Sequence, residues 1–352
     1  MTPMAFYAPL KAPTHPNPSG DRTLARALIQ ALEIAGFRPD LASDLRLIDR
    51  TGNAVTQTEL QSKADAVIPE IIAQGHKKNW AFWLTYHNYY KAPDLIGPRV
   101  ADALNIPYVQ IESTRARKRL EGPWADFAVA AERAAERADL IFYFTKRDAE
   151  ALSAYAPAGQ KLVHLRPFLP RTDLPPHSTR TGPMLSAAMM RPGDKLASFE
   201  LIAQTLAMLD TPWQLNIAGD GAARSDVAAL MAQFGDRVQF LGELNATGMA
   251  QAYANARLLF WPGVNEAIGL TYLEAQAVGI PVLAQDRPGL RDVLAPTPSY
   301  PSPEAGPMAL AAQLKHMLEH PIDPHPIQDH IRKHHLLPAA AQTLRIALED
   351  LL

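Results

Sequence analysis

Short apolar runs alternate with segments of helical periodicity along almost the whole chain of 352 residues. In the first half, the apolar runs that predict strands lie at 4–9, 80–86, 108–111 and 140–144. Between them, spacings of three and four residues predict helices, as in 21–36, where Leu24, Leu28 and Leu32 share one face. Strands that alternate with helices indicate βαβ units and a parallel sheet covered by helices.

A proline-rich stretch at 166–183 interrupts this alternation. Proline fixes the backbone and has no N–H to donate, so we predict a linker without regular structure at 167–183. The alternation then restarts, with predicted strands at 184–188, 214–218, 238–241, 258–261 and 282–284. The sequence therefore predicts two α/β domains, at 1–166 and 184–324, and a helical tail at 325–352 that crosses back onto the first domain.

Composition narrows the class of protein. Lys and Arg total 34 against 36 Asp and Glu, a balance that argues against a dedicated nucleic-acid-binding protein. Cysteine is absent, which excludes disulfides, thiolate metal sites and a cysteine nucleophile. No apolar run reaches the roughly 18 residues of a membrane span, and the first residues lack the pattern of a signal peptide. We expect a cytoplasmic protein without a nucleic-acid partner, and nothing in the sequence supports contact with a membrane surface.

The most informative segment is 265–282, because open α/β sheets bind ligands beyond the carboxyl ends of their strands. A strand is expected to end near Trp261, a loop carries Glu266, and a helix is expected to begin near Ile268 or Gly269 and end at Gly279. Unpaired N–H groups at a helix start suit a diphosphate. Glu266 and Glu274, one on each side, could accept hydrogen bonds from hydroxyl groups, the layout that a nucleotide sugar requires.

Two cations follow the predicted strand that opens the second domain. Arg191 and Lys195 would lie at its carboxyl end, where they could neutralise a departing diphosphate. The alternative is a pair of solvated surface charges.

These segments resemble the family 4 (group 1) retaining glycosyltransferases. The resemblance rests on the E-x7-E spacing of Glu266 and Glu274, the Gly269-Leu270 pair, and the Gly-Ile-Pro-Val ending at 279–282. Ile268 departs from the aromatic residue usual in the family. The family has the GT-B fold, which implies two Rossmann-like domains facing across a central cleft.

The resemblance implies a reaction and roles for named residues. A sugar would pass from a UDP-, GDP- or ADP-linked donor to a hydroxyl acceptor (a glycan, lipid or small molecule) with retention at the anomeric carbon. The acceptor would attack from the leaving-group face, and a donor phosphate oxygen would take its proton. Glu266 would hold the sugar and Glu274 the ribose, and Arg191 and Lys195 would stabilise the diphosphate. The backbone of 267–270 would contact the donor, through residues Ala267, Ile268, Gly269 and Leu270.

Three further positions are predicted to border the donor. Gly219 follows the strand at 214–218. The segment that it begins resembles the glycine motif of dinucleotide-binding proteins but lacks the last glycine, so it does not predict an NAD-binding site. Glu243 lies in a segment that resembles the base-contacting loop of the family, and Gly20 lies in a glycine-containing loop of the first domain. The residues themselves indicate a tight strand-to-helix turn at Gly219, and the resemblance implies that this turn borders the nucleotide. Glu243 and Gly20 are each equally consistent with an ordinary turn.

The acceptor side is predicted from residues at strand ends of the first domain. Tyr86 and His87 end one strand, and Glu112 stands where the family often has a histidine. His87 could orient or deprotonate a hydroxyl, with a structural histidine as the alternative. Arg115 and Arg117 belong to a basic run that is either a solvated face or a contact for an anionic acceptor.

No cofactor or metal is expected, since the chain lacks the Asp-x-Asp pair of metal-dependent glycosyltransferases. The H-x-x-E-H string at 316–320 imitates a zinc protease motif, but Pro321 ends that helix at once. Two alternatives stay open: a GT-B nucleotide-sugar epimerase, and a GT-B module that binds nucleotide sugars without turnover.

Overall fold

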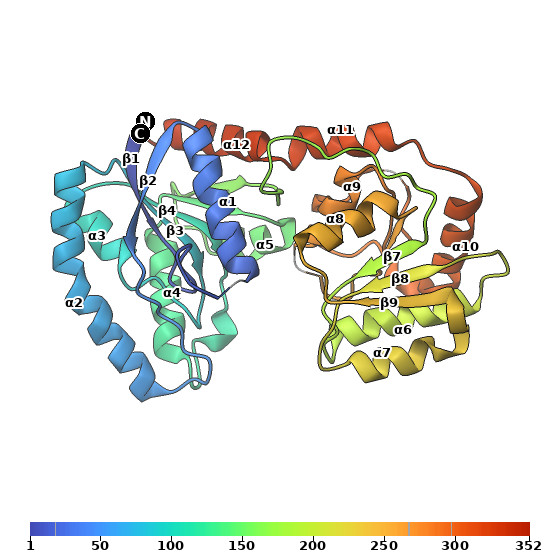
Figure 1. Ribbon diagram of the computed structural model, residues 1–352. Coiled ribbons are helices and arrows are strands. Elements are labelled where there is room, and N and C mark those ends of the chain that lie inside the picture. The colour runs from blue at the N-terminus through green and yellow to red at the C-terminus, as the bar shows by residue number, and fades with distance from the viewer. Residues whose placement is uncertain (18, 267, 297) are drawn as a thin grey trace. The chain divides into compact units, whose positions relative to one another are not determined.

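The computed structural model describes residues 1–17, 19–266, 268–296 and 298–352 (Figure 1). The chain forms two compact units. The first contains Met1–Arg166 together with Leu337–Leu352, and the second contains Pro167–Leu336. The predicted tail is therefore divided, since its final helix belongs to the first unit, and the predicted linker belongs to the second.

The first unit is built on a parallel sheet with the strand order β2-β1-β3-β4-β5-β6. Its strands are β1 (Thr2–Tyr7), β2 (Phe37–Ser43), β3 (Trp83–Asn88), β4 (Tyr108–Ser113), β5 (Leu140–Tyr143) and β6 (Lys161–His164). β1, β3 and β4 are almost wholly buried, as expected for central strands covered on both faces. The sheet order brings the carboxyl ends of β1, β3 and β4 side by side.

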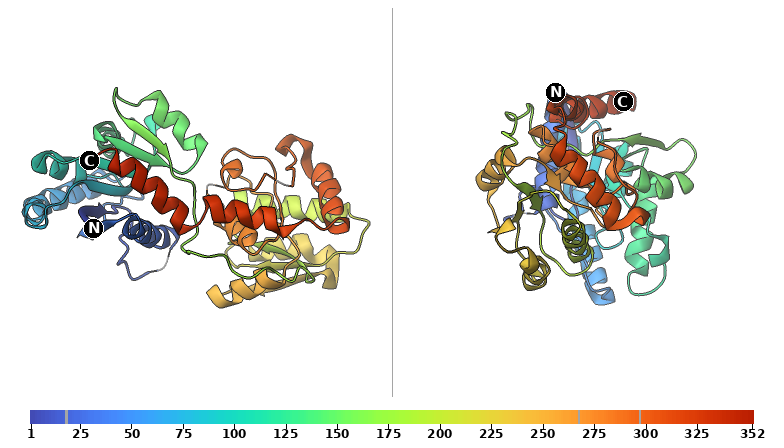
Figure 2. Two further views of the ribbon diagram at one scale, coloured as in Figure 1. Left: turned by 90° about the horizontal axis from the view of Figure 1, so that it is seen from above. Right: turned by 90° about the vertical axis from the view of Figure 1, so that its right-hand side faces the viewer.

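Helices cover this sheet, and their ends follow local rules. They are α1 (Gly20–Ile34), α2 (Ala54–Lys78), α3 (Gly97–Leu104), α4 (Ala125–Arg137), α5 (Lys146–Ala154) and α12 (Leu337–Glu349), with the short turn η1 (Arg117–Arg119). Ser19 caps α1 by accepting from the Arg22 N–H at 3.2 Å. α12 packs against α1 within the first unit (Figure 2).

The second unit repeats the architecture with the strand order β11-β10-β7-β8-β9, again parallel. Its strands are β7 (Met184–Ala187), β8 (Leu215–Ala218), β9 (Val238–Gly242), β10 (Leu259–Phe260) and β11 (Val282–Leu283). Its helices are α6 (Asp194–Ala207), α7 (Arg224–Met231), α8 (Ala246–Asn255), α9 (Leu270–Ala277), α10 (Gly306–Glu319) and α11 (Pro324–His334), with the turns η2 (Ala232–Arg237), η3 (Leu290–Asp292) and η4 (Pro303–Ala305).

The proline-rich stretch runs over the second unit in extended form, held by isolated contacts. Leu169 bridges Leu336, and its N–H donates to the His335 carbonyl at 2.8 Å. The buried Ser178 hydroxyl donates to the Ala256 carbonyl at 2.6 Å. Among the residues described, no helix combines the length and apolarity needed to cross a membrane.

Candidate functional site

The loop that carries Glu266 is tied to the first turns of α6. The Val264 N–H donates to the Ser198 hydroxyl at 3.1 Å, and the Asn265 side-chain amide donates to Asp194 at 2.9 Å. Asn265 adopts a left-handed backbone conformation with φ 48°. A non-glycine residue in this region is uncommon and is often found at functional sites. The loop therefore has a defined shape before any ligand binds.

Glu266 and Lys195, both predicted from the sequence, meet in this loop. The Lys195 ammonium lies 2.5 Å from Glu266 Oε2, which also accepts from the Trp261 indole N–H at 3.0 Å. The ammonium also lies 5.3 Å from the centre of the Trp261 ring. Both charged side chains are largely buried, with 28% and 19% of their surface exposed. A cation and a carboxylate are thus fixed side by side at the carboxyl end of β10.

The helix start predicted at 268–269 lies one residue later, since α9 begins at Leu270 and Gly269 is its N-cap. Gly269 has φ 66°, and a Cβ there would lie 2.4 Å from the Tyr272 ring and 3.7 Å from Cγ of Glu266. Glycine is required for this turn. The start of α9 therefore adjoins Glu266. Ile268 is half-buried, and Ala267 lies outside the described residues.

Glu274 lies on α9, and its Oε2 accepts from the Tyr253 hydroxyl of α8 at 2.9 Å. The pKa of Glu274 is raised, because the surrounding protein partly removes water from its carboxylate. The Tyr253 hydrogen bond acts in the opposite direction, and the exposed part of the side chain limits the rise. Glu274 and Tyr253 line a pocket of about 810 Å³ between α8 and the proline-rich stretch 169–177. Its volume lies within the range of small-molecule sites.

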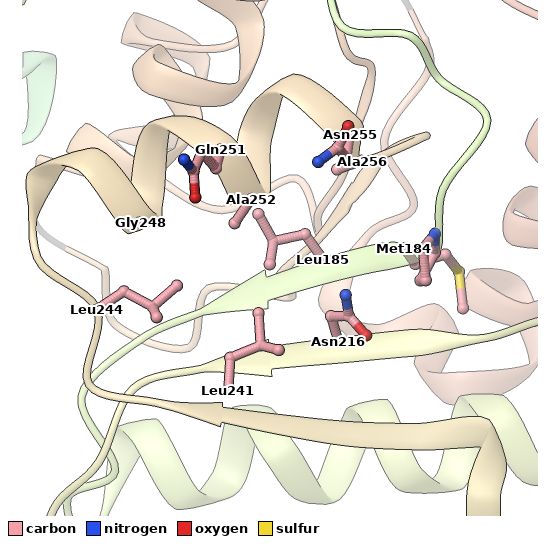
Figure 3. Close-up of a pocket in the computed structure, with 11 residues that line it drawn as sticks. Met184, Leu185, Asn216, Leu241, Leu244, Gly248, Gln251, Ala252, Asn255 and Ala256 are labelled. Atoms are coloured by element: carbon pink, nitrogen blue, oxygen red, sulfur yellow. The ribbon is translucent and has the colours of Figure 1, made fainter.

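A second pocket of the same unit, about 260 Å³, lies between α8 and the sheet. Figure 3 shows Leu185, Asn216 and Leu241 on the strands, with Gln251 on α8 above them. It contains no charged side chain and none of the predicted site residues. We therefore place the candidate site at Glu266 and Glu274.

The other donor-side predictions have different surroundings. Gly219 has φ 132°, and a Cβ there would lie 2.0 Å from the Ala188 carbonyl oxygen, so the fold itself requires this glycine. At Gly20, by contrast, a Cβ would meet nothing within 4 Å. Glu243 and Arg191 are exposed on loops after β9 and β7.

In the first unit, the structure brings His87 and Glu112 together. Both have left-handed backbones, with φ 67° and 58°, and they lie between the paired positions Tyr86–Ile111 and Asn88–Ser113 of β3 and β4. His87 Nδ1 is 3.7 Å from Glu112 Oε2 and 3.3 Å from Asp21 Oδ1 at the start of α1. A paired backbone irregularity thus directs an imidazole and a carboxylate to one point.

The charges of this cluster shift one another's pKa values. Burial opposes protonation of His87, but Glu112 and Asp21 outweigh it and raise the His87 pKa above its ordinary 6.5. Burial raises the pKa of Glu112, against the effect of His87. The contact with His87 lowers the pKa of Asp21.

We expect the stability of the protein to fall as pH rises through the raised pKa of His87. Protonated His87 is bound more tightly in the folded chain, so its contribution is complete below pH 6.5 and is lost above the folded pKa. Urea unfolding at several pH values from about 5.5 to 9, the range in which histidine titrates, measures how the free energy of unfolding changes with pH. The His87→Gln variant is the comparison. An identical slope in the variant would contradict the assignment.

The remaining acceptor-side predictions are placed as follows. The Arg115 side chain has no exposed surface and donates to the largely buried Glu132 of α4 at 2.9 Å, so it is not part of a solvated face. Arg117 is exposed and lies against the Tyr155 ring at 4.3 Å. Tyr86 is buried beside Glu112, and burial raises its pKa.

Sequence reasoning missed three residues that complete these clusters. Asp21 lies in the first turn of α1 and pairs with His87, whereas Ser19 caps that helix. Trp261 and Tyr253 each donate to one of the two glutamates. Trp261 ends a predicted strand, so its position could have indicated it, whereas Tyr253 lies on a helix and gave no signal.

Solved structures share this fold over the whole chain. The lipopolysaccharide outer core galactosyltransferase WaaB superposes with a TM-score of 0.72 at 16% identity, covering 100% of both chains. The sucrose-phosphate synthase of Thermosynechococcus elongatus gives 0.67 at 17% identity, covering 100% of this chain and 99% of the other. The fold is therefore that of the GT-B glycosyltransferases, as predicted.

The sequence family agrees with the fold. Residues 189–320 match the family model "Glycosyl transferases group 1". This matched segment contains Glu266 and Glu274, so the match supports the resemblance to the group 1 glycosyltransferases seen around these two residues.

Curated relatives match parts of the chain. A GDP-mannose-dependent alpha-mannosyltransferase of Mycolicibacterium smegmatis is 39% identical over 83 residues, which are 24% of this chain and 21% of that enzyme. The 2-deoxystreptamine glucosyltransferase of Streptomyces kanamyceticus is 27% identical over 267 residues, 68% of this chain and 67% of that enzyme. The first of these matches thus spans about a fifth of its relative's length.

Proposed function

We propose that this protein is a retaining glycosyltransferase that transfers a sugar from a nucleotide diphosphate sugar to a hydroxyl acceptor. The observation that carries the proposal is the Lys195–Glu266 pair beside Gly269 and the start of α9. A cation from α6 for the departing diphosphate, a carboxylate for sugar hydroxyls and the unpaired N–H groups at the start of α9 come together around the loop that carries Glu266. Relatives that are GDP-mannose-dependent, and a fold neighbour solved in complex with UDP-glucose, support a nucleotide-sugar donor.

In the proposed reaction, the bond from the anomeric carbon to the diphosphate breaks, and a bond to the acceptor oxygen forms on the same face. The hydroxyl proton passes to a phosphate oxygen of the leaving group. Lys195 and the exposed Arg191 stabilise the negative charge that develops on the diphosphate. Glu266 accepts hydrogen bonds from the sugar, so the donor is held at both ends of the breaking bond.

On the acceptor side, we assign His87 and Glu112 to the hydroxyl that attacks. Their proximity of 3.7 Å and their left-handed backbones support this role. The proposal needs no cofactor or metal, since Lys195 and the helix N–H groups supply the positive charge. A cytoplasmic location remains a prediction.

A two-stage experiment tests the function. Thermal-shift screening against UDP, GDP, ADP and their sugars identifies the donor, and radiolabelled donor is then incubated with sugar and polyol acceptors. We expect slow donor hydrolysis, transfer to an acceptor, and a product with the anomeric configuration of the donor. An epimerised nucleotide sugar would establish the epimerase instead, and binding without turnover would establish a non-catalytic module. An inverted product would refute retention.

Replacing Glu274 by alanine should weaken binding of the nucleoside diphosphate by about 1–3 kcal/mol, because ribose hydroxyls would lose a charged acceptor. Calorimetry with the diphosphate measures this directly. The matched control is Glu319→Ala, which removes a carboxylate from an exposed position near the end of α10. Equal affinity in the Glu274 variant and the wild type would remove Glu274 from the ribose site.

A further inference from the structure

A line of aromatic rings leads away from His87 over the surface of the first unit. The ring centres of His87 and Tyr89 are 4.8 Å apart, those of Tyr89 and Tyr90 5.6 Å, and those of Tyr90 and Trp124 5.8 Å. Tyr89, Tyr90 and Trp124 are all half-buried, so each keeps some exposed surface. Such rings form a platform on which the apolar faces of sugars can stack.

Two cations lie at the far end of this line. The Lys91 ammonium is 5.7 Å from the Tyr90 ring centre and 5.3 Å from that of Trp124. The Arg119 guanidinium is 5.3 Å from Tyr90 and 5.4 Å from Trp124. Both cations are therefore fixed against the same two rings, at distances typical of cation–π contacts. We call Tyr90, Lys91, Arg119 and Trp124 the cationic patch.

The charge of this patch is not neutralised within the protein. Within residues 1–17, 19–266, 268–296 and 298–352, neither Lys91 nor Arg119 pairs with a carboxylate, and the buried Nε of Arg119 has no hydrogen-bond partner. Asp49 lies nearby, since its backbone carbonyl accepts from the Trp124 indole at 3.4 Å. Its carboxylate instead accepts hydrogen bonds from the backbone N–H groups of 51–53 and from the Gln57 side chain. The two like charges repel each other although the rings attract both, and an anion bound between them would relieve this repulsion.

We propose that the acceptor carries a phosphate group, which Lys91 and Arg119 bind while the adjoining sugar or polyol stacks on Tyr89 and Tyr90. This inference rests on the proposed function, since it names the acceptor of the same reaction. Arg119 can donate to a phosphate through two parallel N–H bonds, and Lys91 adds a point charge. Bound in this way, the acceptor extends along the rings toward His87 and Glu112, where its hydroxyl reacts. The phosphate belongs either to a soluble sugar phosphate or to a lipid headgroup.

Binding to the full-length protein, without donor, tests the phosphate site. Calorimetry compares glucose 6-phosphate with glucose, and sedimentation compares vesicles of phosphatidylcholine alone with vesicles of phosphatidylcholine and phosphatidic acid in equal parts. We expect one of the two probes that carry an anionic phosphate monoester, glucose 6-phosphate or phosphatidic acid, to bind more tightly than its counterpart without net charge, glucose or phosphatidylcholine. The glucose 6-phosphate arm indicates a soluble acceptor, and the vesicle arm indicates a lipid acceptor.

Lys91→Gln and Arg119→Gln should each weaken that binding by about tenfold or more, because each removes a charge-assisted contact. Lys118→Gln is the matched control, since Lys118 is exposed in the same turn and lies next to Arg119. Circular dichroism and binding of the nucleoside diphosphate, whose predicted site is in the second unit, should be unchanged in all three. Equal binding of charged and neutral probes, or equal losses in the Lys118 control, would overturn the phosphate site. The two proposals can also be separated. If the wild-type protein neither hydrolyses nor transfers any donor, but the phosphate probe binds and the variants weaken it as expected, then the proposed function is wrong and the phosphate site is retained.

Discussion

Replacing Lys195 by methionine should lower kcat by about 10²–10³-fold while the donor still binds. The Lys195 ammonium is the cation held at Glu266, at the point where the start of α9 would receive the diphosphate. Its charge matters most when the bond to the diphosphate breaks, because negative charge then accumulates on the leaving oxygen. Removing it should therefore affect the transition state more than the bound ground state. Initial rates with the donor identified by screening, together with calorimetry on the diphosphate, separate kcat from binding.

A second lysine in the same unit provides the control for this experiment. Lys315 of α10 also pairs with a carboxylate, that of Asp210 at 2.7 Å, but both side chains are exposed, at 42% and 74%. Exposed pairs contribute little to stability. Lys315→Met should therefore leave both stability and rate nearly unchanged. Similar losses of kcat in the two variants would show that removing any positive charge from this unit lowers the rate. A Lys195→Met variant with the wild-type kcat would show that Lys195 has no role in the mechanism.

The central strands could be predicted because burial on both faces makes them continuously apolar. The runs at 80–86, 108–111 and 140–144 correspond to β3, β4 and β5, within a few residues. The outermost strands of the first sheet, β2 and β6, were not predicted. β2 carries Arg38, Pro39 and Asp40, and most positions of both strands keep some exposed surface, so neither has an apolar run to detect.

The arrangement of the donor-side candidates follows more directly from the sequence than that of the acceptor-side candidates, for a related reason. Glu266, Gly269 and Glu274 lie within nine residues of sequence, so one loop and one helix determine their arrangement. Asp21, His87 and Glu112 come from three separate segments. They meet because β1, β3 and β4 are neighbours in the sheet, which local spacing does not reveal.

The burial of Arg115 also depended on tertiary packing. In the sequence it begins a basic run that is typical of a solvated face. In the structure, α4 presents Glu132 and Glu136, one turn apart, to its guanidinium at 2.9 and 3.5 Å. A buried arginine needs such partners, because an unpaired charge in the interior is costly. Arg115 is consequently not available for binding a ligand.

Gly219→Ala should lower the free energy of unfolding by about 3 kcal/mol or more, because the position combines two kinds of strain. The φ of 132° is one that side chains rarely adopt, and the added Cβ would lie 2.0 Å from the Ala188 carbonyl oxygen. That oxygen belongs to backbone and cannot rotate away. The Ala188 N–H is bonded to the Ala218 carbonyl at 3.1 Å, and the Gly219 N–H to the Gly242 carbonyl at 2.7 Å. Relief would therefore require β7 and β8 to separate.

Gly20→Ala is the matched control for Gly219→Ala, since a Cβ at Gly20 meets nothing within 4 Å and the residue is the first of α1. Alanine there should be neutral or stabilising by up to about 1 kcal/mol, because it reduces the freedom of the unfolded chain. Urea unfolding followed by tryptophan fluorescence measures both variants, with Trp213 and Trp261 reporting on the second unit. If the two alanine variants unfold at the same urea concentration, the close approach of β7 and β8 at Gly219 is wrong. The role of Gly219 would then have to be sought in ligand contact, which the donor affinity of the Gly219 variant would measure.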